Sequence, residues 1–179
     1  VAGRGDASLT LSGYEMFRVP GTYTGANVVG WRADRWTKIH SGVAVISEAV
    51  GICCGQKHDP GIRRATWVTL RSIAGRQISV VSTHFAQRAS NTEGLLAVSV
   101  QNLGELTASL RKYGPVVVGG DLNMQYGGAR YERDLMAEHN LVPTFETLGN
   151  SFSTHDGGGH IDYVVLRQEY ELSVERHFP

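Results

Sequence analysis

The sequence has few cysteines, few lysines, no long apolar run and no excess of charge of either sign. Its 179 residues include two cysteines, and 17 basic residues balance 17 acidic ones. Cys53 and Cys54 are adjacent, and neighbouring cysteines rarely form a disulfide without strain. No second cysteine pair is present to build a zinc site. This scarcity excludes a small disulfide scaffold and argues against a cysteine zinc module.

The missing apolar run and the balanced charge exclude further classes. A membrane-spanning helix needs about 18 consecutive apolar residues, and no run approaches that length, so we expect no membrane span. A net charge of zero argues against binding polyanions through bulk charge alone. The basic residues are mostly arginine, the residue type suited to recognising phosphate.

What remains is an ordinary globular composition, 41% hydrophobic and 19% charged. A chain of this length buries roughly 70% of the surface that its unfolded form exposes, which is enough for a substantial core. No internal repeat or linker divides it. We therefore expect a single domain over residues 1–179, and a monomer.

Local patterns predict mainly strands, then alternating helices and strands. The first 25 residues are broken by glycine and predict irregular structure. Two runs rich in β-formers, 64–71 and 77–85, flank Ala74-Gly75 and predict a hairpin. Leucine and valine at spacings of three and four predict an amphipathic helix from Thr92 to about Tyr113. The other expected elements are strands over 27–31, 36–47, 116–120 and 161–166, and a helix over 129–139. This order indicates a layered α/β or α+β domain.

Three short polar groups stand at the ends of apolar strands, where ligand sites commonly gather. They are Ser82-Thr-His-Phe85, Gly120-Asp-Leu-Asn123 and His160-Ile-Asp-Tyr163. Each group alone has a structural explanation: a buried histidine, a turn, or a carboxylate that braces a strand. Together they supply an imidazole, two carboxylates and an amide, which favours metal-assisted phosphoryl chemistry.

Asp121 and Asn123 form the central group. On an extended backbone, residues two apart point to the same face, so we expect both side chains to face one ligand. The carboxylate would accept a proton from water while the amide orients that water. Both also offer the hard oxygen ligands that Mg²⁺ prefers. The preceding Gly119-Gly120 is expected to let the backbone approach a ligand closely.

At these residues the chain resembles the endonuclease/exonuclease/phosphatase superfamily. The matching motifs are Ser82-Thr-His-Phe85, Gly119-Gly-Asp-Leu-Asn123 and Gly159-His-Ile-Asp-Tyr-Val164, with weaker support from the 27–36 region and from Thr154-His155. The resemblance implies a four-layer sandwich of two mainly antiparallel β-sheets flanked by helices. It also implies hydrolysis of phosphate esters with Mg²⁺, Mn²⁺ or Ca²⁺.

The resemblance also implies roles for single residues. His84 would contact the scissile phosphate, Asp121 would activate the attacking water, and Asn123 would orient it. Asp121 and Asn123 would be metal ligands, and Asp162 would orient a histidine further along the chain. The nearby Arg88, Asn91 and His155 are candidate substrate-binding residues.

Two features of the superfamily do not match this sequence. The metal-binding Glu that precedes the Gly-Tyr step has no counterpart, because Glu15 follows Gly13-Tyr14 in a different context. The terminal Ser-Asp-His motif has none either, and His177 lacks the preceding Asp. We therefore expect the sequence to be part of a larger domain, incomplete at both ends, and these 179 residues alone to be inactive or weakly active.

Other functions remain open. The substrate could be nucleic acid, a lipid headgroup or a soluble phosphate ester. A non-catalytic relative would use the same cleft to bind a phosphorylated ligand or a partner protein. An unrelated zinc hydrolase is disfavoured because the seven histidines show no ligand spacing such as His-x-x-x-His.

Overall fold

The computed structural model describes residues 11–19, 27–48, 62–86, 94–149, 152–155 and 158–168. Its centre is a six-stranded sheet with the strand order β3-β4-β5-β6-β8-β7. Strands β5 and β6 are parallel, and every other neighbouring pair in this sheet is antiparallel. The strands are β3 (Trp36–Glu48), β4 (Ile62–Ser72), β5 (Gln77–His84), β6 (Val116–Asp121), β7 (Leu141–Pro143) and β8 (Asp162–Arg167).

The predicted hairpin is confirmed as β4 and β5. Its turn closes through hydrogen bonds between Ser72 and Arg76 and from the Gly75 amide to the Ser72 carbonyl. Gly75 has a φ of 81°, a left-handed conformation that glycine adopts without steric cost. Strand β4 therefore leads directly into β5, whose far end carries one of the polar groups.

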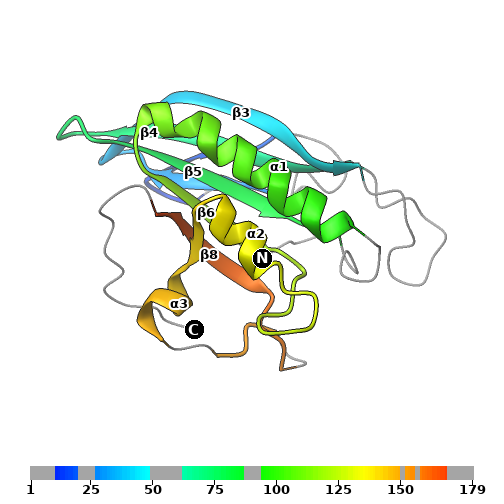
Figure 1. Ribbon diagram of the computed structural model, residues 1–179. Coiled ribbons are helices and arrows are strands. Elements are labelled where there is room, and N and C mark those ends of the chain that lie inside the picture. The colour runs from blue at the N-terminus through cyan, green and yellow to red at the C-terminus, as the bar shows by residue number, and fades with distance from the viewer. Residues whose placement is uncertain are drawn as a thin grey trace.

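Helix α1 (Leu95–Leu110) makes the connection that the parallel pair β5–β6 requires. It lies across one face of the sheet, over β3, β4 and β5 (Figure 1). Its apolar residues Leu96, Val100, Leu103 and Leu110 recur at helical spacing and are buried against Val81, Val116 and other core residues. The expected helix is thus confirmed, although Thr92 lies outside the described residues, and a short 3₁₀ turn, η2 (Arg111–Tyr113), follows it.

A small sheet covers part of the opposite face. Strands β1 (Tyr14–Phe17) and β2 (Val29–Arg32) pair antiparallel with each other. Val29 and Trp31 of β2 form a separate buried cluster with Val68 and Leu70 of β4. Because successive strand residues point to opposite faces, β5 contributes Val81 to the α1 side and Val80 to this second cluster.

The structure corrects several expected boundaries. Strand β1 falls in the region predicted to be irregular. The second helix, α2, spans only Arg133–Glu138, because residues 126–130 form turns closed by hydrogen bonds such as Tyr131 N–H to the Gly128 carbonyl. Strand β7 and helix α3 (Thr144–Leu148) were not expected, since each is too short for a periodic signal.

The predicted class is confirmed: an α/β fold with two sheets and flanking helices. No helix in the described part of the chain is both long and apolar enough to cross a membrane.

Candidate active site

Three of the expected site residues form one row across the central strands. His84 at the end of β5 pairs with Asp121 at the end of β6, and Asp121 pairs with Asp162 at the start of β8. Directly paired residues on neighbouring strands place their side chains on the same face of the sheet. This face is opposite the one that α1 covers, because the adjacent residues Phe85, Leu122 and Tyr163 belong to the α1-side core.

His84 and Asp121 are close enough to interact but are not tightly bonded. Their Nε2 and Oδ2 atoms are 3.5 Å apart, and the side chains are 22% and 25% exposed. Partial burial lowers the pKa of His84, against the opposing charge of Asp121. Burial likewise raises the pKa of the Asp121 carboxyl, against a hydrogen bond from the Asn123 amide and the charge of His84. Burial thus disfavours the charged form of both groups.

Asn123 is held in a turn rather than in a strand. Strand β6 ends at Asp121, and Asn123 has a left-handed φ of 47°. Its backbone N–H donates to Asp121 Oδ1 at 2.7 Å, so the Asp121 side chain closes the turn. The expectation of an extended Asp-x-Asn pair is therefore wrong, because the backbone leaves the extended conformation at Asn123.

The Asn123 side chain is oriented by the neighbouring strand. Its Nδ2 donates to the carbonyl oxygen of Phe85 at 3.0 Å, just beyond His84. This bond fixes the rotation of the amide group and leaves Oδ1 as its acceptor. The turn and the amide bond together connect the ends of β5 and β6 at the site.

The two glycines before Asp121 have different surroundings. A Cβ atom on Gly120 would collide with the carbonyl oxygen of Thr83, whereas one on Gly119 would meet nothing within 4 Å. The close backbone approach at Gly120 is therefore to a neighbouring strand. The approach of a ligand to Gly119-Gly120 stays a prediction, and the open space at Gly119 leaves room for it.

Asp162 opens strand β8, and its side chain is exposed. Asp162 lies at the first position of the strand, and the apolar residues of β8 all follow it. Its backbone N–H and that of Ile161 both donate to Thr154 Oγ1, each at 3.1 Å. The Ile161 carbonyl accepts a hydrogen bond from Leu122, which continues the β6–β8 pairing past the row.

His155 lies next to Thr154 and is exposed. It is close to the row along the chain, because the hydroxyl of the adjacent Thr154 accepts the backbone N–H of Asp162. The structure thus brings together His84, Asp121, Asn123, Asp162 and His155. Arg88 and Asn91 lie outside the described residues.

The donor set has the chemistry for a hard cation but is small. Asp121, Asp162 and the Asn123 amide offer oxygen atoms, the ligand type that Mg²⁺, Mn²⁺ and Ca²⁺ take. Within the described ranges, no group of three or more His, Cys, Asp or Glu side chains is arranged to hold a metal ion. The residues present therefore fit a cation that takes one or two protein carboxylates and completes its shell with water and phosphate oxygens.

Two residues near the site were missed or misjudged from the sequence. From the sequence, the pair Arg63-Arg64 could face a phosphate or, as arginines at strand ends usually do, face solvent. In the structure Arg63 is 2% exposed, and its charge helps to lower the pKa of His84. Gln125 Oε1 accepts the backbone N–H of His160 at 3.1 Å and joins the loop after β6 to β8. Strand β4 also contains Arg64 and Arg71, so nothing in the sequence singled out Arg63, and Gln125 had no signal either.

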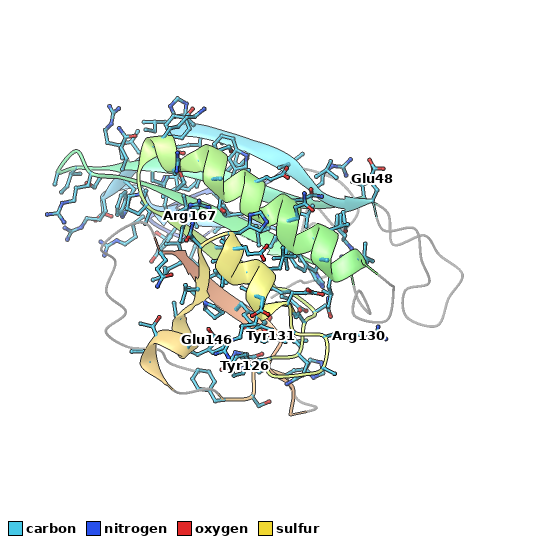
Figure 2. All side chains as sticks on the ribbon, in the orientation of Figure 1. Glu48, Tyr126, Arg130, Tyr131, Glu146 and Arg167 are labelled. Atoms are coloured by element: carbon cyan, nitrogen blue, oxygen red, sulfur yellow. The ribbon has the colours of Figure 1, made fainter. Side chains whose placement is uncertain are left out.

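An aromatic cluster lies beside the row. His160 is buried against Phe145, with ring centroids 4.1 Å apart, and against Tyr126. Tyr131 donates to Glu146 Oε1 at 2.9 Å, and Figure 2 shows Tyr126, Tyr131 and Glu146 together between α3 and the loop after β6. These contacts pack the loop between Asp121 and α2 against α3.

Comparison with protein families finds one matching family model, described as the Endonuclease/Exonuclease/phosphatase family, over residues 80–179. The match includes the whole row. None of the curated proteins matches the sequence significantly.

Solved structures with the same fold are distant in sequence. A mannosyl-6-phosphatase from Bacteroides thetaiotaomicron is 16% identical, with a TM-score of 0.66, and the match covers 89% of this chain and 64% of that one. The human Nocturnin catalytic domain, solved with bound sulfate, is 18% identical with a TM-score of 0.62, covering 87% and 61%. TDP2 from D. rerio, complexed with a single-strand DNA product, is 13% identical with a TM-score of 0.56, covering 87% and 62%. The chain therefore spans less than two thirds of the length of these structures, and the likeness shows the fold.

Proposed function

The chain belongs to the endonuclease/exonuclease/phosphatase family, and from that premise we propose that its protein hydrolyses phosphate esters at the row His84, Asp121 and Asp162. The observation that carries the proposal is the register of β5, β6 and β8, which aligns these residues on one face. An imidazole and two carboxylates at adjoining strand ends supply the acid, base and charge that hydrolysis needs. The proposal treats residues 1–179 as part of a single, monomeric domain.

Asp121 is the proposed general base. A base works best when its pKa lies near the working pH. Partial burial raises the pKa of Asp121 and so increases its affinity for a proton from water. Its Oδ1 atom is occupied by the Asn123 amide, whereas Oδ2 faces His84 and is the oxygen we assign to proton transfer.

Asn123 orients the water in this proposal. Its Nδ2 is committed to the Phe85 carbonyl, so the amide oxygen is the atom that accepts a hydrogen bond from the water. A water molecule that donates to Asp121 and Asn123 has a lone pair directed away from both. That geometry suits attack on a phosphorus atom held by the other residues.

His84 and Asp162 act at the phosphate side of the same row. An N–H of His84 would donate to a phosphate oxygen and stabilise charge that develops there. Asp162 would orient a further imidazole, in the carboxylate–histidine pairing that fixes a tautomer. His155, with Arg88 and Asn91, would bind the substrate phosphate.

A divalent cation is part of the proposal. Asp121 and Asn123 would hold Mg²⁺, or Mn²⁺ or Ca²⁺ in its place, through their side-chain oxygens. When bound, such an ion polarises a phosphoryl oxygen and stabilises its negative charge. Its charge would also favour the ionised form of Asp121.

Nucleic acids, lipid headgroups and soluble phosphate esters are the candidate substrates. Structures of the same fold include a mannosyl-6-phosphatase and a protein complexed with single-strand DNA. A net charge of zero provides no broad basic surface, so a nucleic acid would need a local patch.

The test uses the full-length protein with plasmid DNA, sphingomyelin and a generic phosphodiester in parallel, with Mg²⁺ or with EDTA. We expect turnover of at least one substrate in Mg²⁺, its loss in EDTA, and its loss in Asp121→Ala. Asp134→Asn, on the exposed side of α2, is the control. Inactivity on every substrate by a folded protein would reject the enzyme and favour the non-catalytic, ligand-binding relative. The same assay on residues 1–179 tests the expectation that this segment alone is inactive or weakly active.

A further inference from the structure

A single side-chain hydroxyl accepts two backbone N–H groups at the start of strand β8. Thr154 Oγ1 accepts the backbone N–H groups of Ile161 and Asp162, both at 3.1 Å. A threonine hydroxyl has two acceptor lone pairs, and these two bonds use both. Asp162 is the member of the catalytic row that β8 contributes.

This hydroxyl acts where the strand has no neighbour on one side. Strand β7 pairs only with Val165, Leu166 and Arg167, so it does not extend alongside the first three residues of β8. Strand β6 pairs with β8 from Leu166 to Asp162. Thr154 therefore supplies hydrogen bonds to β8 beyond the point where β7 stops, at the residue that carries the chemistry.

The same segment positions His155. The backbone N–H groups of Thr154 and His155 both donate to the Gly159 carbonyl, at 2.9 and 3.1 Å. Ser153 Oγ donates to the His155 carbonyl at 2.7 Å. Hydrogen bonds within the segment thus hold the backbone around His155, and the Thr154 hydroxyl bonds this segment to strand β8.

We propose that Thr154 is a positioning residue of the active site. Its hydroxyl keeps Asp162 in register with Asp121 and holds His155 beside them, so that one side chain sets the relative position of two site residues. The effect on turnover rests on the proposed hydrolase function, whereas the positioning itself does not.

The deciding comparison is between Thr154→Val and Thr154→Ser in the full-length protein. Valine has nearly the same volume but no acceptor, and serine keeps the acceptor. Ser153→Ala is a second control, because it removes the hydroxyl that contacts the His155 and Gly159 carbonyls and leaves the Thr154 hydroxyl in place.

Amide hydrogen exchange measures the positioning without any substrate. In Thr154→Val, we expect the Ile161 and Asp162 amides to exchange roughly five to ten times faster, as expected for a lost hydrogen bond. We also expect the backbone resonances of Asp121 and His155 to shift. Thr154→Ser and Ser153→Ala should leave the exchange of these two amides within about twofold of wild type. Unchanged exchange in Thr154→Val, or shifts confined to Ile161 and Asp162, would overturn the proposal.

Turnover then separates positioning from simple support of the fold. We expect Thr154→Val to lower kcat/KM by roughly 10- to 100-fold, because a small misplacement of site residues is costly. Thr154→Ser should restore most of that loss. Two results would overturn the proposal: faster amide exchange in Thr154→Val with unchanged kcat/KM, or equal losses of kcat/KM in Thr154→Val and Thr154→Ser. Either would show that the hydroxyl holds the strand without affecting the site. If wild type hydrolyses nothing, the proposed function fails, and the exchange and resonance shifts alone decide the role of Thr154.

Discussion

Two neighbouring rows of residues cross β5, β6 and β8 one residue apart. One row is largely buried, and the other is partly or fully exposed. The first row is Thr83, Gly120 and Tyr163, and the second is His84, Asp121 and Asp162. Thr83 and Tyr163 are 2% and 3% exposed. In the second row His84 and Asp121 are partly exposed, and Asp162 is exposed.

The difference follows from the pleat of the sheet. Successive residues of a strand point to opposite faces, so the first row faces the core under α1 and the second faces away from it. The same three strands therefore stabilise the fold on one side and present polar groups on the other. Substitutions one residue apart should separate stability from activity.

The largest expected effect comes from Asp121→Asn in the second row. We expect kcat of the full-length protein to fall by roughly a thousandfold, because asparagine cannot accept the proton. The asparagine oxygen still accepts the Asn123 amide, and burial disfavours the wild-type carboxylate, so the thermal midpoint should stay the same or rise. Enzyme assays and thermal unfolding measure the two quantities. A variant that loses stability as well as activity would contradict the separation of the rows.

Gly120→Ala in the first row should have the largest effect on folding. The new Cβ would collide with the backbone of Thr83, which cannot move without disturbing β5. We expect the free energy of unfolding to fall by about 2–4 kcal/mol in denaturant titrations. Gly119→Ala is the matched control, because its Cβ meets nothing within 4 Å, and it should change stability by less than about 1 kcal/mol. Equal losses in both variants would count against the role assigned to Gly120.

Tyr163→Phe should have an intermediate effect. Its hydroxyl donates to the Met124 carbonyl at 2.7 Å in a buried position, and phenylalanine leaves that acceptor unpaired. The expected loss is about 1–2 kcal/mol in the free energy of unfolding. Tyr14→Phe, on an exposed residue, should change stability by less than about 0.5 kcal/mol. A neutral Tyr163→Phe would mean that the first row is held by apolar contacts alone.

The smallest effect is a pH dependence carried by His84. Its folded-state pKa lies below its ordinary value of 6.5, so the unfolded chain binds a proton first as the pH falls. Stability should therefore decline as the pH drops below about 6.5, with a slope of at most about 1.4 kcal/mol per pH unit. The raised pKa of Asp121 has the opposite effect on stability. Above pH 3.8 the folded state binds this proton more readily than the unfolded chain, so this group favours folding as the pH falls toward 3.8. Denaturation of wild type and His84→Gln in EDTA should diverge in this range. Parallel curves would contradict the assigned shift.

The members of the second row could be predicted from the sequence, but their alignment could not. Short polar groups after apolar runs identified His84, Asp121 and Asp162 as strand-end residues. Their register depends on strand pairing between distant segments, which no local pattern encodes. The turn at Asn123 was missed because Asp-x-Asn fits both an extended strand and a turn closed by the aspartate side chain.

Residues outside the row were harder to predict for similar reasons. Arg63, next to Arg64, could face a phosphate or solvent from the sequence alone, and its burial depends on the packing around β4. Gly120 was correctly singled out, but its neighbour is the Thr83 backbone on an adjacent strand. Strands β1 and β7 are too short to show alternation, and tertiary pairing alone defines them.

The parallel pairing of β5 with β6 has a consequence for how the molecule assembles. The chain must complete the crossover through α1 before His84 and Asp121 can meet. Contacts between distant segments form late and slowly compared with helices and hairpins. The β4–β5 hairpin and α1 can form from local contacts, whereas the second row requires three segments to arrive in order. The aligned second row is thus among the last features that the folding chain acquires.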